Sequence, residues 1–257
     1  MTSRVALVTA SSAGLGAACV KALAPHFRVV VNYHSRPQKA EEVIKEATAI
    51  PPLYKHDASS GDRFVALQAD VADRTSVQQL VQQTVDRMGR LDVVVSNAGW
   101  TRITDFMNLD DQVAEDDWDR CFNVNVKAHL WLLYAAKPHL EANPDKGSFV
   151  TVASLAGVRP SGSSVPYAVS KAAAIYLTRC LALVCGKSGV RCNSVSPGLL
   201  LTEWGQRFPE DKIEATKNKA VLGRLAEIDD VAAQVATLAL SRSITGQNVV
   251  IDGGIAL

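Results

Sequence analysis

Short runs rich in Val and Ala recur along the chain, and longer segments with a helical spacing of apolar residues separate them. The runs lie at residues 5–10, 28–33, 64–70, 91–97, 148–154, 190–197 and 248–254. Their apolar residues are nearly continuous, which is typical of strands buried on both faces, and helix-length connections favour right-handed crossovers. The pattern therefore predicts an α/β fold, a doubly wound parallel sheet of about seven strands with helices on both faces.

Three segments interrupt this alternation without marking a domain boundary. Residues 50–62 carry two prolines and several small polar residues, which indicates a surface loop. Residues 101–112 are irregular and precede a helix with an acidic start, where carboxylates oppose the positive end of the helix dipole. Residues 199–222 combine aromatic and charged positions and are interpreted as a lid over the substrate. We expect one domain over residues 1–257.

The composition excludes several classes of function. Of the 257 residues, 47% are hydrophobic and 21% charged, as in a globular protein. Lys and Arg total 27 against 26 for Asp and Glu, so no positive excess favours nucleic acid. Five cysteines without a CxxC pair and five histidines without HExxH argue against a disulfide framework or a metal site. The start of the chain lacks the apolar core of a signal peptide, and no stretch approaches the ~18 apolar residues that span a membrane, so we expect a cytoplasmic protein.

The first strand runs into a turn of small residues, and a helix, AACVKALA, follows at once. Small side chains let a diphosphate approach the helix N-terminus, where unpaired N–H groups and the dipole favour an anion. Gly14 and Gly16 taken alone are equally compatible with a tight turn and close helix packing. In a Rossmann-like sheet, this turn is the expected place for a dinucleotide. The candidate residues are Thr9, Ser11, Ser12, Gly14, Leu15 and Gly16.

The second strand ends where such a fold brings the adenosine ribose of its cofactor. The candidate residues here are Asn32, Tyr33, Ser35 and Arg36. No carboxylate is present among them to bind the ribose 2′-OH of NAD(H), whereas Ser35 and Arg36 could hold a 2′-phosphate. The sequence therefore favours NADP(H) over NAD(H), although Arg36 by itself is also compatible with a solvated surface arginine.

Ser154, Tyr167 and Lys171 form the candidate catalytic set. The interval of four residues places Tyr167 and Lys171 on one face of a helix, which Ser164 is expected to cap. Ser154 follows the fifth predicted strand, at the carboxyl edge where open α/β sheets bind ligands. Carbonyl reduction needs a proton donor for the oxygen, a role that suits Tyr167. The ammonium of Lys171 favours the tyrosinate form, and the Ser154 hydroxyl can stabilise oxyanion charge. Each residue alone has an ordinary structural interpretation, but together they indicate an oxidoreductase.

These features resemble the short-chain dehydrogenase/reductase family over nearly the whole chain. The glycine turn is similar to that family's TGxxxGxG turn, with Ala10 where the family usually has its first glycine. The family's NAG motif is matched at residues 97–99, and its YxxxK motif is matched by Tyr167 and Lys171. We expect Ala10 to keep a negative φ, so that its Cβ causes no strain.

The resemblance implies further contacts with the cofactor. Asp70 and Val71 would lie around the adenine, with Asp73 rather than Asp70 capping the next helix. Asn97 would stabilise the sheet edge, and Lys171 would bind the ribose hydroxyls. Contacts are also implied for Ala98, Gly99, Tyr167, Pro197, Gly198 and Thr202, the last of these at the nicotinamide carboxamide.

A fourth catalytic residue, Asn125, is implied as well. Its family counterpart holds a helix kink and a water that links the lysine to solvent. Asn125 is preferred to Asn123 because the residues that follow it, VKA, match the family pattern. The family also implies a homotetramer or homodimer, built through helices at residues 116–142 and 165–187 and through the C-terminal strand.

The expected function is NADPH-dependent, reversible reduction of a keto group in a small molecule. Candidates for the substrate pocket are Trp100, Val158, Arg159, Trp204 and Phe208. Two alternatives stay open, an NAD-linked alcohol dehydrogenase of the same family and an NADP-binding sensor or scaffold without turnover. Substrate identity and product handedness depend on the geometry of the pocket rather than on residue order.

Overall fold

The computed structural model describes residues 3–53 and 61–257, and most of the loop expected at 50–62 lies outside them. Seven strands form one parallel sheet in the order β3-β2-β1-β4-β5-β6-β7. They are β1 (Val5–Val8), β2 (Arg28–Tyr33), β3 (Phe64–Gln68), β4 (Val93–Ser96), β5 (Ser148–Val152), β6 (Arg191–Pro197) and β7 (Asn248–Ile251). The predicted doubly wound sheet is confirmed. Several strands are shorter than predicted, and their last residues lie as many as three positions earlier in the chain.

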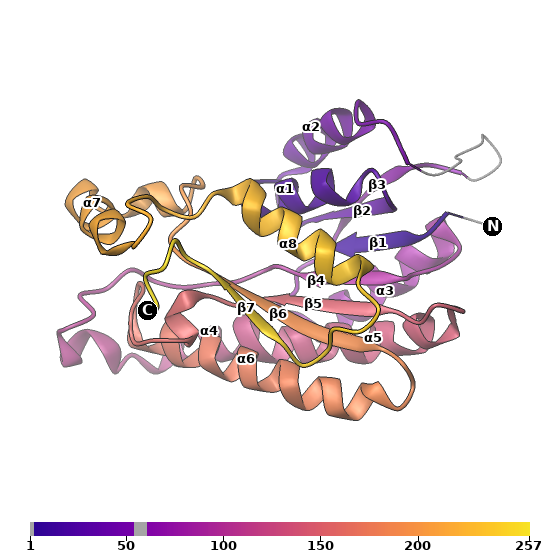
Figure 1. The fold of residues 1–257 in the computed structure, drawn as a ribbon. Coiled ribbons are helices and arrows are strands. Elements are labelled where there is room, and N and C mark those ends of the chain that lie inside the picture. Colours follow the sequence, from indigo (N-terminus) through magenta and orange to yellow (C-terminus); the bar gives the residue numbers. More distant parts are fainter. Residues whose placement is uncertain (1–2, 54–60) are drawn as a thin grey trace.

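Helices cover both faces of the sheet (Figure 1). They are α1 (Gly14–Leu23), α2 (Pro37–Thr48), α3 (Arg74–Met88), α4 (Glu115–Phe122), α5 (Ala128–Ala142), α6 (Val165–Gly186), α7 (Glu210–Lys219) and α8 (Ile228–Leu240). One core lies between the sheet and α1, α2 and α8, and the other lies between the sheet and α3, α5 and α6.

Strand β1 has a continuous apolar run because both of its faces are buried. Ala6 and Val8 belong to the core under α1 and α8, whereas Val5 and Leu7 belong to the core on the opposite face. Successive side chains of a strand point to opposite faces, so a strand covered on both sides needs an apolar residue at every position. Strand β1 also lies between β2 and β4, where the chain order reverses and doubly wound sheets bind their ligands.

Two predicted helix caps are present. The Asp73 side chain accepts a hydrogen bond from the Thr75 amide at the start of α3. The Ser164 side chain accepts one from the Tyr167 amide at the start of α6. Each cap satisfies an amide that the first helical turn leaves without a partner.

The conformation expected for Ala10 was wrong. Its φ is +49°, in the left-handed region, and its amide donates to Oδ1 of Asn32 at 2.9 Å. A Cβ in this conformation costs about 1–2 kcal/mol, a cost that glycine avoids. The turn therefore adopts a left-handed conformation despite the Cβ, and Asn32 from the neighbouring strand helps to hold it.

Helix α6 is long and apolar enough to cross a membrane by length and composition alone, with a mean hydropathy of 1.5 in its most apolar 18-residue window. Half of that window is buried inside the protein, and the helix carries the buried Lys171. These features are those of a core helix packed against a sheet.

Candidate active site

The glycine turn leaves little room above the start of α1. A Cβ added to Gly16 would lie 2.5 Å from the Ala10 carbonyl oxygen and 2.7 Å from Nδ2 of Asn97. Gly14 has a φ of +57°, and a Cβ there would lie 3.3 Å from Cγ2 of Thr202. No side chain in the described parts of the chain caps α1, so its first amides are available to an anion. The two glycines thus let the turn pack tightly against Asn97 and against Thr202, where the predicted lid begins.

Three polar residues predicted to bind the cofactor are buried and use their side chains inside the fold. Oγ1 of Thr9 accepts from the amides of Asn97 and Ala98, at 2.9 and 3.3 Å. Oγ of Ser11 donates to the Val8 carbonyl at 2.7 Å. Nδ2 of Asn32 donates to carbonyls on the neighbouring edge strand and its connection. These side chains therefore join the ends of neighbouring strands, and those of Thr9 and Ser11 are engaged within the fold.

Asn97 joins the end of β4 to the same turn. Its Nδ2 donates to the carbonyl oxygens of Thr9 and Ala10, at 3.0 and 3.2 Å. This contact holds two neighbouring strand ends together at the sheet edge, in line with the role that the family resemblance implies.

At the adenosine end, Ser35 and Arg36 are exposed and Tyr33 is half-buried. Asp70 is also half-buried, and its Oδ1 accepts from the Ala72 amide at 2.9 Å. This internal bond still leaves the other carboxylate oxygen of Asp70 facing His34, at 3.8 Å.

Arg36 is paired with a residue that the sequence did not single out. Its Nη1 lies 2.9 Å from Oε2 of Glu203 in the predicted lid, and Lys39 binds the other oxygen of that carboxylate. Hydrogen bonds from Lys39 and Arg36 lower the pKa of Glu203 to about 2, so its carboxylate is ionised at neutral pH. Lys39 follows Arg36 within the first turn of α2, and that spacing was the available signal for a second cation.

Ser154, Tyr167 and Lys171 come together at the carboxyl end of β5. Oγ of Ser154 accepts from the Ala156 amide at 3.1 Å and also forms a side-chain hydrogen bond with Tyr167. Nζ of Lys171 donates to the Val152 carbonyl at 2.9 Å and lies 5.7 Å from the centre of the Tyr167 ring. The helical interval predicted from the sequence brings the phenol and the ammonium together, and the packing of α6 against the end of β5 adds the Ser154 hydroxyl.

Burial controls the electrostatics of this cluster. It raises the pKa of Tyr167, and the hydrogen bond from Ser154 offsets part of that rise. Burial also lowers the pKa of Lys171 to about 8. Removing either group from water disfavours its charged form, so the tyrosine is held as a neutral acid. The net shift of the Tyr167 pKa is upward, so the lowering expected from the neighbouring ammonium does not prevail over burial.

Asn125 lies in a π-helical turn, Asn123–Lys127, between α4 and α5. Its Oδ1 accepts from the Trp100 amide at 2.7 Å, and its Nδ2 donates to the Trp100 carbonyl and to Oγ of Ser170, each at 2.9 Å. A Cβ on Gly99 would lie 3.3 Å from Nζ of Lys171 and 3.4 Å from Oδ1 of Asn125. Asn125 thus lies beside the cluster, and the resemblance-based preference for it over Asn123 is compatible with the geometry.

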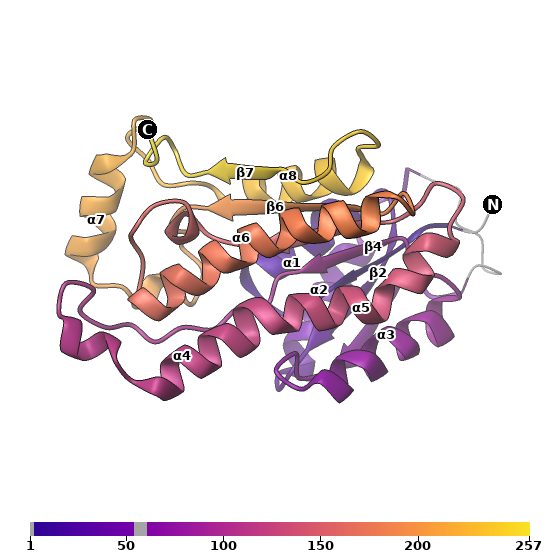
Figure 2. The same ribbon diagram turned by 90° about the horizontal axis from the view of Figure 1, so that it is seen from below.

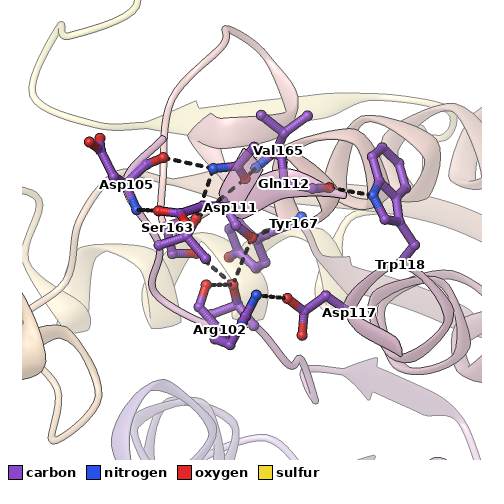
Figure 3. Close-up of polar contacts among 12 residues, drawn as sticks. Arg102, Asp105, Asp111, Gln112, Asp117, Trp118, Ser163, Val165 and Tyr167 are labelled. Atoms are coloured by element: carbon purple, nitrogen blue, oxygen red, sulfur yellow. Dashed lines mark hydrogen bonds and ion pairs between the residues drawn. The ribbon is translucent and has the colours of Figure 1, made fainter. Parts of the chain in front are cut away.

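Gln112 was not predicted as a site residue, yet it connects the irregular segment to the start of α6 (Figure 3). Its side chain is buried, with Oε1 accepting from the Val165 amide at 2.9 Å. Its Nε2 donates to the carbonyls of Asp105 and Asn108, at 2.7 and 3.1 Å. Because Tyr167 lies two residues after Val165, this glutamine helps to set the position of the phenol.

Replacing Gln112 with Leu is expected to lower the free energy of unfolding by about 1–3 kcal/mol, because buried polar groups lose their partner. We also expect kcat to fall while the Kd for the cofactor stays within about twofold, since the start of α6 shifts relative to the crevice. Urea denaturation and initial rates measure these effects, with Gln79→Leu on the exposed side of α3 as the matched control. An unchanged kcat would limit Gln112 to a structural role.

The substrate-pocket candidates occupy four different surroundings. The Trp100 ring lies under the guanidinium of Arg120, 4.6 Å from its carbon. Trp204 and Phe208 pack edge to face at 5.2 Å within the predicted lid. Val158 is exposed, whereas Arg159 donates to the Ile255 carbonyl and is held by the C-terminal segment.

The predicted lid lies at the correct end of the molecule. Its helix α7 has no buried residue and lies beyond the carboxyl ends of the strands, as the arrowheads of β6 and β7 show in Figure 2. The position is suitable for a segment that covers the site, since α7 contributes little to either core.

Known proteins match the chain over nearly its whole length. A family model described as Enoyl-(Acyl carrier protein) reductase matches residues 9–256. A protein described as ketoacyl reductase 2 of the granaticin polyketide synthase, from Streptomyces violaceoruber, is 39% identical over 97% of this chain and 95% of its own length.

Two solved structures share the fold. One is a short-chain dehydrogenase from Burkholderia cenocepacia J2315 in complex with NADP, with 33% identity and a TM-score of 0.85 over 100% of this chain and 99% of that one. The other is a 3-ketoacyl-(acyl-carrier-protein) reductase from Brucella melitensis complexed with NADH, with 25% identity and a TM-score of 0.84 over 99% and 98%. The chain belongs to the short-chain dehydrogenase/reductase family, as its motifs predicted.

Proposed function

We propose that this protein reduces the keto group of a small ketoacyl-type molecule to an alcohol, reversibly, with NADPH as the hydride donor. The observation that carries the proposal is the cluster of Ser154, Tyr167 and Lys171 at the strand edge that also holds the glycine turn. Ketoacyl reductases among the relatives support the substrate class.

The crevice fits a nicotinamide dinucleotide. The first amides of α1 have no side-chain cap in the described residues and suit a diphosphate, and the end of β2 presents Arg36 instead of a carboxylate. The cofactor would supply the hydride chemistry itself. One structural relative holds NADP and another holds NADH, so the choice between them must come from residues of this chain. Arg36 and Lys39 favour the 2′-phosphate of NADPH.

The chain's own residues manage the proton and the oxygen of the substrate. Tyr167, kept neutral by burial, donates its phenolic proton to the carbonyl oxygen. The Ser154 hydroxyl orients that oxygen and stabilises its developing charge. The Lys171 ammonium compensates the charge left on the phenolate, and Asn125 holds the Trp100 backbone and Ser170 in place around them.

A homodimer or homotetramer belongs to the same proposal. Helices α5 and α6 expose large apolar side chains on their outer faces, more than a solvated helix of a monomer usually presents. These side chains are Leu130, Tyr134, Tyr176, Leu183 and Val184. The cytoplasmic location stays a prediction from the sequence.

The test is a substrate panel with purified protein. We expect oxidation of NADPH with ketoacyl thioesters and slower oxidation of NADH, followed by absorbance and product analysis. Turnover only in the direction of alcohol oxidation with NAD⁺ would favour the alternative alcohol dehydrogenase. Tight NADPH binding without turnover of any carbonyl or alcohol would favour the sensor or scaffold.

A further inference from the structure

A carboxylate from the predicted lid binds two cations at the start of α2. Glu203 pairs with Arg36 and Lys39 through its two oxygens, although 167 and 164 residues separate it from them in the chain. Arg36 is the residue before the first turn of α2, which no side chain of the described residues caps. Two cations at an uncapped helix N-terminus favour an anion here, and Glu203 supplies that anion from within the chain.

This contact joins the predicted lid, beside the glycine turn, to the residues that follow β2. Thr202, the residue before Glu203, lies against Gly14 of the phosphate-binding turn. Arg36 lies beyond the end of β2, where a dinucleotide fold places the adenosine ribose. The cations that Glu203 occupies are therefore the ones that a 2′-phosphate would need.

We infer that Glu203 is a cofactor-specificity residue, whose carboxylate competes with the adenosine 2′-phosphate for Arg36 and Lys39. The inference rests on the proposed use of a dinucleotide at this crevice. A phosphomonoester carries up to two charges and three acceptor oxygens, so it displaces a single carboxylate from such a cation pair. NADH has no 2′-phosphate and leaves the Glu203 contacts in place.

Removing the carboxylate charge of Glu203 should therefore strengthen the binding of ligands that carry a 2′-phosphate and leave other ligands unaffected. In Glu203→Gln, the Kd for NADPH and for 2′,5′-ADP is expected to fall about 2- to 10-fold, the size expected for exposed ion pairs. The Kd values for NADH and 5′-AMP should stay within about twofold, because neither ligand needs the two cations. The gain should shrink at about 1 M salt, where the Debye length falls to about 3 Å and exposed ion pairs are screened.

Calorimetric or fluorescence titration of the full-length protein measures these constants without turnover. Glu210→Gln is the matched control, since it makes the same change of charge in the same lid. A second series places Glu203→Gln in an Arg36→Ala, Lys39→Ala background, where its effect on NADPH should vanish.

The outcomes separate this inference from the proposed function. Unchanged NADPH affinity in Glu203→Gln, or equal tightening of NADPH and NADH, would overturn the role of Glu203 even if the wild type prefers NADPH. Tighter NADPH binding that Glu210→Gln reproduces would overturn it too. Conversely, a wild type that prefers NADH but shifts towards NADPH in Glu203→Gln supports the inference and contradicts the proposed preference for NADPH.

Discussion

Replacing Tyr167 with Phe is expected to lower kcat by about 10²- to 10⁴-fold, the contribution typical of a positioned general acid. The substitution removes the only phenolic proton at the carboxyl end of β5 among the described residues and leaves the ring. Because the ring still packs beside Ser154 and Lys171, the Kd for NADPH should stay within about twofold. Steady-state rates with the best substrate of the panel and cofactor titration measure the two effects.

Tyr176→Phe is the matched control for this variant. Tyr176 lies about two helical turns after Tyr167 on the same helix, on the outer face proposed for subunit contacts, so its hydroxyl is remote from the proposed chemistry. We expect its kcat to equal that of the wild type. A Tyr167→Phe enzyme with wild-type kcat would remove the tyrosine from the mechanism and with it the central part of the proposed function.

Replacing Lys171 with Met is expected to lower kcat by about 10²-fold, because the ammonium that compensates phenolate charge is lost. A pH profile supplies a second readout. The buried ammonium has a pKa of about 8, so the kcat/KM of the wild type should fall as the pH rises past that value and Lys171 becomes neutral. The variant should lack this limb, since Met has no charge to lose.

Stability should respond to pH in the opposite direction. The unfolded chain has a lysine pKa of about 10.4, so between about pH 8 and that value it binds more protons than the folded protein. The folded pKa lies below the unfolded one, and the wild-type free energy of unfolding should therefore rise with pH across this window relative to Lys171→Met. Lys187→Met, exposed at the end of α6, is the control and should leave both profiles unchanged. Identical profiles for wild type and Lys171→Met would contradict the assigned pKa.

Features that depend on neighbours in the chain could be predicted without the structure. The continuous apolar run of β1 indicates burial on both faces of the sheet, because successive side chains of a strand point to opposite faces. Asp73 and Ser164 were predicted as caps because a cap binds an amide only a few residues away. The interval from Tyr167 to Lys171 is set by the pitch of a helix.

Other features were beyond local reasoning. Ala10 was expected at negative φ, but its turn is shaped by Asn32 from the next strand and by Asn97 from a strand farther along the chain. Thr9 and Ser11 look the same in sequence whether they face a ligand or the interior. Only packing shows that both are buried and bonded within the fold.

The sequence by itself determined the doubly wound sheet and the family, and it predicted that Tyr167 and Lys171 share one helical face, because these features rest on periodicity, on motifs or on spacing within one element. The tertiary structure alone decided that Gln112 supports the start of α6 and that Glu203 binds Arg36 and Lys39. Contacts between segments 53 and 167 residues apart depend on how elements pack, and residue order does not encode that geometry locally.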